Sequence, residues 1–233
     1  MRNLPKKHKK TKKMIGSKKL GTGIYTIPDI HLILGYPLYK IRRYIRKYWD
    51  NLGMFLYKDT YSWIDGKRKV VPFLVLIELY TFFEMLEKGA KTKAIAKTRK
   101  EMAIEFKTPY PFAYRDYLVE RNTISYYAGN LLITADKKQQ TSFVNMIEKF
   151  GKKVKFKENL AYQFFPLANS ENILVDPRHQ FGQPVINKTN IPTETIYLMH
   201  KAGEEKKALS VLYNISEQQI KDVIRFHEYS KAA

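Results

Sequence analysis

Cysteine is absent from the 233 residues of this chain, and so are long apolar runs. A chain without cysteine forms no disulfide framework and carries no thiol chemistry, which favours a cytoplasmic protein. The most apolar stretch, residues 70–83, is shorter than the ~18–20 apolar residues of a membrane-spanning helix, and it contains Glu78. The basic start of the chain lacks the apolar segment of a signal peptide. We therefore predict a protein with no membrane partner.

Side chains that carry catalysis or bind metals are few and scattered in the sequence. The five histidines stand at positions 8, 31, 179, 200 and 227 and show no metal-ligand spacing. Aspartate and glutamate form no nuclease-type cluster in the sequence, and it contains no glycine-rich phosphate loop of the required form. Gly21 and Gly23 are interpreted as a hinge. We predict that the protein is not an enzyme and needs neither a metal nor a cofactor.

Positive charge is abundant and unevenly distributed. The net charge is +20, of which residues 1–108 carry +16, residues 109–168 carry +4 and residues 169–233 carry none. This concentration of positive charge predicts that the first half of the chain binds nucleic acid. Residues 1–20 hold nine of the cations and are predicted to form a flexible basic tail. That tail either binds phosphate as an arm or is simply solvated, and the sequence leaves both alternatives open.

Residues 24–50 show the pattern of two short helices separated by a tight turn. Apolar residues at 27, 30, 33 and 34 indicate the buried face of the first helix, and residues 35–37 interrupt it. The second helix has an apolar inner face formed by Leu38, Ile41, Ile45, Tyr48 and Trp49. Its outer face carries the residues predicted to bind DNA, which are Tyr39, Lys40, Arg42, Arg43, Arg46 and Lys47. The pattern predicts a helix-turn-helix whose second helix enters the major groove.

A β-hairpin is predicted directly after this unit, at about residues 60–71. Asp65 and Gly66 lie between two β-type runs, and this dipeptide favours a two-residue turn. The tip would present Lys67, Arg68 and Lys69 to the DNA backbone as a wing. A basic helix alone is also typical of a solvated surface helix. The helix, the turn and the basic hairpin tip together favour DNA binding.

The middle of the chain predicts further helices and a small mixed region. Residues 73–88 form a helix that is apolar on nearly every side, so we expect a helical partner and possibly a second protomer to cover it. A homodimer or a higher even oligomer is therefore expected. A second helix is predicted at 92–106. Residues 109–168 are interpreted as a connecting α+β region with a hairpin near 128–130, a helix at 143–150 and two strands near 154–165.

The last segment, residues 169–233, predicts a second helix-turn-helix. Residues 181–186 are interpreted as a strand, followed by a helix through residue 201 and a second over 204–213 with Ala208, Leu209 and Leu212 inward. Ser216 and Gln219 form a capping-box pattern before the final helix. The fold class is thus predicted as mainly α with small β hairpins (α+β). Its segments are 1–20, 21–108, 109–168 and 169–233.

Several motifs resemble known regulators. Residues 25–45 resemble the N-terminal unit of MerR-like regulators. Residues 175–178, 181–186, 189–193 and 215–220 resemble the small C-terminal domain, long of unknown function, of a family of VapB-type antitoxins. Longer members of that family carry a MerR-like winged unit first, and residues 72–74 and 110–112 resemble them as well. The resemblance implies a type II toxin–antitoxin module with a PIN-like ribonuclease toxin and repression of its own operon.

Two features depart from that pattern. The exposed face of the last helix is predicted to mix charges, with Glu217, Gln218, Lys221, Asp222 and Arg225, so we expect it to contact protein rather than to grip DNA. The chain also stops soon after this helix, so the toxin-binding surface is expected elsewhere than in a long tail. Two other hypotheses stay open: a basic structural protein associated with RNA, and a MerR-like regulator of transcription that senses a ligand and has no toxin partner.

Overall fold

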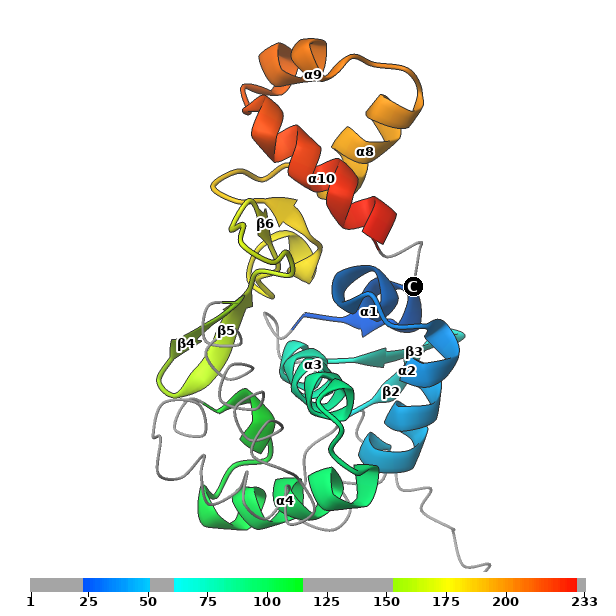
Figure 1. Cartoon of the computed structure of the whole chain (residues 1–233), viewed down its shortest axis with the longest axis vertical. Helices are drawn as coiled ribbons and strands as arrows, with labels where there is room; N and C mark the ends of the chain where they lie inside the picture. The colour runs from blue at the N-terminus through cyan, green and yellow to red at the C-terminus, as the bar shows by residue number, and fades with distance from the viewer. Residues whose placement is uncertain (1–22, 51–60, 115–152, 230–233) are drawn as a thin grey trace, which may run out of the picture.

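The protein has an α+β fold, shown by a computed structural model that describes residues 23–50, 61–114 and 153–229. The molecule is elongated (Figure 1), with α4 at one end and the helices of the last segment at the other. Within the described residues, no helix is long and apolar enough to cross a membrane. The predicted basic tail, the hairpin near 128–130 and the helix at 143–150 lie outside the described residues.

The first helix pair forms where the periodicity predicted it. Strand β1 (Tyr25–Thr26) leads into α1 (Ile27–Leu34), and Gly35 ends that helix with a positive φ of 74°. A capping box starts α1, because the Asp29 backbone N–H donates to Thr26 Oγ1 at 3.3 Å and Asp29 accepts from the Thr26 N–H at 2.8 Å. Helix α2 (Leu38–Tyr44) continues directly into η1 (Ile45–Trp49), which is a π-helical turn. Neither the π turn nor β1 was predicted.

A three-stranded antiparallel sheet of order β1-β3-β2 lies against this pair. The hairpin predicted at 60–71 is confirmed as β2 (Trp63–Asp65) and β3 (Arg68–Val71). Its turn was predicted one residue too early. Asp65 pairs with Arg68 as the last rung of the ladder, so the turn residues are Gly66 and Lys67. Gly66 takes a positive φ of 62°, as the first turn position of a type II′ hairpin requires.

Helix α3 (Phe73–Glu87) is the centre of the core and is buried on nearly all sides. Other parts of the same chain cover it: its Phe82 ring packs 5.3 Å from Trp49, Phe83 lies 4.3 Å from Tyr36, and Tyr80 lies 4.9 Å from Phe164. The expected helical partner therefore comes from the chain itself. The burial of α3 gives no argument for a second protomer, and the even-numbered oligomer stays a prediction.

Helix α4 (Thr92–Glu105) and the short η3 (Pro111–Ala113) close the lower end of the core. Ile95, Arg99 and Met102 are buried in the register that the sequence predicted. The two strands expected near 154–165 are confirmed as the hairpin β4 (Val154–Lys157) and β5 (Leu160–Phe164). The β5 strand contacts α3, and through it the core of the first half reaches the last segment.

The last segment contains a two-stranded sheet and three helices. Strands β6 (Ile173–Leu174) and β7 (Val185–Ile186) pair antiparallel, and η4 (Gln180–Gly182) lies between them. The strand predicted at 181–186 is therefore shorter than expected, because Phe181 and Gly182 take positive φ values of 57° and 89°. Left-handed residues cannot continue a β ladder.

The last segment ends with three helices, α8 (Thr193–Lys201), α9 (Lys206–Tyr213) and α10 (Glu217–Tyr229). The predicted capping box is confirmed, since the Gln219 N–H donates to Ser216 Oγ at 3.2 Å. The prediction of which α9 side chains face inward was partly wrong. Leu209 is buried, whereas Ala208 and Leu212 are exposed, because α10 and α8 cover only one narrow side of this helix.

Candidate nucleic-acid interface

The outer face of α2 and η1 carries an unbroken row of polar side chains. Ile41, Ile45 and Trp49 are fully buried on the inner face. Tyr39 is 71% exposed at the start of the helix. The exposed cations that follow it are Arg42, Arg43, Arg46 and Lys47. The predicted division of this helix into an apolar and a basic face is therefore confirmed for these residues.

These four cations are not neutralised by the rest of the described chain. Within residues 23–50, 61–114 and 153–229, Arg42, Arg43, Arg46 and Lys47 make no ion pair. Lys47 lies over the Tyr48 ring, with Nζ 5.3 Å from the ring centre. A row of uncompensated charges on one helix face creates a positive potential that attracts a polyanion.

The π turn at the end of this helix is held from inside the core. The Asp50 N–H donates to the Ile45 carbonyl at 3.0 Å, which closes the wide turn. Trp49 Nε1 donates to Glu78 Oε2 at 2.8 Å, so the buried end of the turn is tied to α3. Because Arg46 and Lys47 stand on this turn, the core bond sets where their side chains leave the surface. Single π turns inside helices occur frequently at functional sites.

Glu78 belongs to a buried ion pair that sequence reasoning missed. Arg99 on α4 donates to Glu78 Oε2 from Nη2 at 2.6 Å and from Nε at 3.0 Å. Burial alone lowers the pKa of Arg99, but the charge and hydrogen bonds of Glu78 outweigh it, so the pKa of Arg99 is raised. The pair lies within the core, because Glu78 is 0% exposed and Arg99 is 4% exposed. Their positions 21 residues apart gave no local signal of the pairing.

Lys40 does not join the row as predicted. Its side chain is half-buried, and Nζ lies 4.9 Å from the centre of the Tyr36 ring and 5.5 Å from that of Phe83. A cation over an aromatic face is held by the ring quadrupole. Lys40 therefore packs against the core edge instead of standing free on the outer face, and the fivefold cationic face of the sequence prediction reduces to four.

The hairpin tip presents two of its three predicted cations. Lys67 and Arg68 are exposed at the turn. Lys69 is half-buried in β3 and forms an ion pair with Asp50 at 2.5 Å. Ser62 Oγ also donates to Asp50, at 2.7 Å. The charge of Lys69 is thus matched by a carboxylate, and the pair ties the hairpin to the end of η1. A contact of Lys69 with DNA stays a prediction.

The second group of helices offers a different surface. Asp222 was expected to be exposed on α10, but it is buried, and it accepts hydrogen bonds from Ser170 Oγ at 2.6 Å and Asn172 Nδ2 at 2.7 Å. Arg225 pairs with Asp222 at 3.0 Å. Glu228 lies 3.8 Å from Lys201. Arg225 on α10 is thus compensated by a carboxylate, whereas the exposed cations on α2 and η1 make no ion pair within the described residues.

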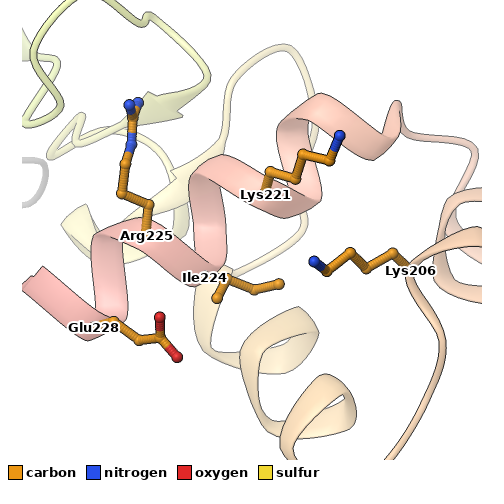
Figure 2. A pocket seen from close by; sticks show the side chains of 5 residues that line it. All are labelled: Lys206, Lys221, Ile224, Arg225 and Glu228. Atoms are coloured by element: carbon orange, nitrogen blue, oxygen red, sulfur yellow. The ribbon is translucent and has the colours of Figure 1, made fainter.

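A hollow of about 370 Å³ lies beside α10. Its lining residues are Lys206, Lys221, Ile224, Arg225 and Glu228. Figure 2 shows Lys206 extending toward Ile224, with Glu228 on the same side of the helix. Its charged lining consists of three cations, of which Arg225 pairs with Asp222, and the carboxylate of Glu228. Within the described residues, no group of three or more histidine and acidic side chains is placed to hold a metal ion.

Comparison with known proteins finds a family match for part of the chain. Residues 173–227 match the family described as protein of unknown function (DUF433), which covers β6 to α10. No curated protein matches the chain. A crystal structure of Rv2018 from Mycobacterium tuberculosis shares 16% identity and superposes with a TM-score of 0.67 over 86% of this chain and 96% of that chain. At this identity the likeness establishes a shared fold.

Proposed function

We propose that this protein binds duplex DNA through the outer face of α2 and η1 together with the tip of the β2–β3 hairpin. The observation that carries the proposal is a set of exposed cations on the second helix of a helix-turn-helix, which make no ion pair in the part of the chain that the structure describes: Arg42, Arg43, Arg46 and Lys47. Lys67 and Arg68 extend this charge to the adjacent hairpin. The arrangement suits a helix in the major groove and a wing on the phosphate backbone.

The contacts divide by position along the helix. Residues near the start of a recognition helix reach base edges, so Tyr39 and Arg43 are assigned to bases. Arg46 and Lys47 lie further along and are assigned to phosphates. The hairpin cations Lys67 and Arg68 are assigned to the backbone as well. This assignment predicts sequence preference from Tyr39 and Arg43 on α2, and general affinity from the cations of η1 and the hairpin.

The protein is further proposed to be the antitoxin of a type II toxin–antitoxin module. The support is the resemblance of residues 175–178, 181–186, 189–193 and 215–220 to VapB-type antitoxins. In this proposal it neutralises a PIN-like ribonuclease toxin from an adjacent reading frame and represses the operon that encodes both. A homodimer would match the two-fold symmetry of an operator with two half-sites.

The test titrates the full chain against duplex from the region upstream of its own reading frame, a scrambled duplex and a structured RNA, over a series of salt concentrations. Tighter binding to the upstream duplex supports a DNA-binding repressor. Preference for the RNA would favour the hypothesis of a basic RNA-associated protein. Equal, strongly salt-dependent binding to all three would reduce the interface to non-specific charge.

The antitoxin assignment has its own test. The adjacent frame is expressed alone and together with this chain, and a direct complex is sought by co-purification. Toxicity that co-expression relieves, with a stable complex, supports the assignment. A neighbour that is harmless alone and does not co-purify would contradict it and leave a regulator of transcription without a toxin partner.

A further inference from the structure

Tyr25 joins the DNA-binding unit to the segment that matches the family of unknown function. Its side chain is only 2% exposed, and its hydroxyl finds no hydrogen-bond partner among the described residues. The ring is enclosed by Gly23 and by Gly182 of the η4 loop. A buried hydroxyl without a partner is unfavourable, so surrounding contacts must hold it in place.

The contact with Gly182 leaves no room for a side chain. A Cβ on Gly182 would lie 2.3 Å from the Tyr25 hydroxyl oxygen and 2.9 Å from Cζ. A Cβ on Gly23 would lie 3.1 Å from Cβ of Pro177, at the start of the same loop. The loop therefore packs onto Tyr25 at Gly182 and reaches Gly23, beside Tyr25, at Pro177.

The loop is braced so that it keeps this shape. Asp176 Oδ1 accepts from the Arg178 N–H at 2.9 Å, and Gly182 N–H donates to the His179 carbonyl at 2.8 Å. Phe181 stands next to the contact with a positive φ of 57° and a side chain that is 86% exposed. A bulky residue other than glycine has a strained backbone at a positive φ. The neighbouring hydrogen bonds must offset the energy of that strain.

On the other side, Tyr25 is placed where it controls the geometry of the DNA-binding unit. It pairs with Val71 in the sheet that carries the hairpin, and its ring lies 6.3 Å from Phe73 at the start of α3. The next residue, Thr26, caps α1. A shift of Tyr25 would therefore move the sheet, the hairpin and the first helix together.

We propose that the contact of residues 176–182 with Tyr25 is a mechanical coupling, through which the state of the 173–227 segment sets the geometry of the DNA-binding unit. This inference rests on the proposed function in that the regulated property is DNA affinity. A partner that docks on the last segment and displaces the loop would then change binding at α2 without touching α2.

The test uses Gly182→Ala in the full chain, with Gly203→Ala as the matched control. Both glycines have positive φ, 89° and 105°, but a Cβ on Gly203 meets nothing within 4 Å. The backbone strain is thus shared, and only Gly182→Ala collides with Tyr25. The chain has two tryptophans, Trp49 in η1 and Trp63 in β2, so tryptophan emission reports on the DNA-binding unit alone.

We expect Gly182→Ala to shift tryptophan emission and to weaken binding to the upstream duplex by about 5- to 150-fold, the usual range of coupling between two sites. Gly203→Ala should leave both unchanged. The double variant Tyr25→Phe with Gly182→Ala removes the oxygen at 2.3 Å and should recover part of both signals. This recovery would not follow from a general loss of stability.

The coupling is overturned if Gly182→Ala has wild-type far-UV circular dichroism, tryptophan emission and duplex affinity. If Gly182→Ala alone does not fold, recovery of folding in the double variant supports the coupling and its absence contradicts it. In the wild type, urea unfolding followed by tryptophan emission and by circular dichroism should coincide, and separate transitions would contradict the coupling. If the wild type binds no duplex, the proposed function is wrong. The tryptophan emission of Gly182→Ala then still tests the coupling by itself.

Discussion

The two groups of helices in this molecule share a capping motif and present different surfaces. Helix α1 opens with a capping box of Thr26 and Asp29, and α10 opens with one of Ser216 and Gln219. On α2 the exposed cations make no ion pair within the described residues, whereas on α10 Arg225 pairs with the buried Asp222. The same capping motif thus occurs beside two different surfaces. The surfaces differ in whether their cations form ion pairs with described residues.

The two halves also differ in what their buried carboxylates bind. In the first half the buried pair of Glu78 and Arg99 ties the basic helix to the core through Trp49, while the exposed cations of that helix make no ion pair with described residues. In the last segment the buried Asp222 reaches the surface cation directly. The comparison indicates that the first half is built to keep positive charge available and the second to compensate it.

The largest expected effect concerns the buried pair. Glu78→Gln leaves the Arg99 guanidinium without a carboxylate in the core, and it should lower the free energy of unfolding by about 3–5 kcal/mol in urea titrations. The control is Glu101→Gln, which breaks only the exposed pair of Glu101 with Lys97 at 3.7 Å and should cost at most about 0.5 kcal/mol. Equal effects of the two changes would show that the buried pair is not a support of the first half.

Next in size is the loss of a base contact on the DNA. Arg43→Ala should cost about 1–3 kcal/mol in binding to the upstream duplex and relax its sequence preference at one position. Arg46→Ala should instead weaken all duplexes alike and lower the slope of affinity against salt by about one. Both effects are read from titrations over a salt series.

The matched control on the second surface is Arg225→Ala, with Lys221→Ala beside it. Because Arg225 is compensated by Asp222 and Lys221 lies in a segment without net charge, neither change should alter duplex affinity. If they weaken binding as much as the α2 variants do, in folded protein, the last segment is also a DNA reader and the contrast between the two surfaces is lost. Unchanged affinity in the combined Arg43→Ala and Arg46→Ala variant would move the interface away from α2.

A smaller effect is expected from acid on the last segment. Burial alone raises the pKa of Asp176, but hydrogen bonds from Arg178 and Gln163 outweigh it, so the pKa lies below its ordinary value. A lowered pKa in the folded state contributes stability above the unfolded-state value of about 3.9, and this contribution is lost as pH falls through the lower folded value. Arg178→Ala should therefore flatten the dependence of the melting temperature on pH below about 4. If the melting temperature of Arg178→Ala falls with pH as steeply as that of the wild type, the pair of Asp176 and Arg178 does not cause this dependence.

The smallest expected effect separates two neighbouring lysines of the hairpin. Lys67→Ala should lower the salt slope of duplex binding by about one, as for other phosphate contacts. Lys69→Ala should change that slope less, because Asp50 already matches its charge, and should cost about 0–1 kcal/mol of stability as a partly exposed pair. The reverse order of slopes would mean that Asp50 releases Lys69 when DNA is bound.

Local periodicity in the sequence determined most of the helices and the exposure of the basic row. Apolar spacing placed α1, α2, α3, α4, α8 and α10, because the buried face of a helix recurs every three to four residues whatever it packs against. The same spacing put Arg42, Arg43, Arg46 and Lys47 on the outer face. These features depend on neighbours within one or two turns, which a sequence displays directly.

Tertiary packing decided which of the polar residues remain free. Lys40 rests on Phe83, Lys69 pairs with Asp50, and Asp222 bonds to Ser170, a partner 52 residues away in the chain. The π turn likewise depends on Glu78, 29 residues from Trp49. No local pattern encodes such pairings, because the energy of a charge depends on the burial and partners that only the folded chain provides. The free and the compensated cations of this protein therefore look alike in its sequence and differ only in its structure.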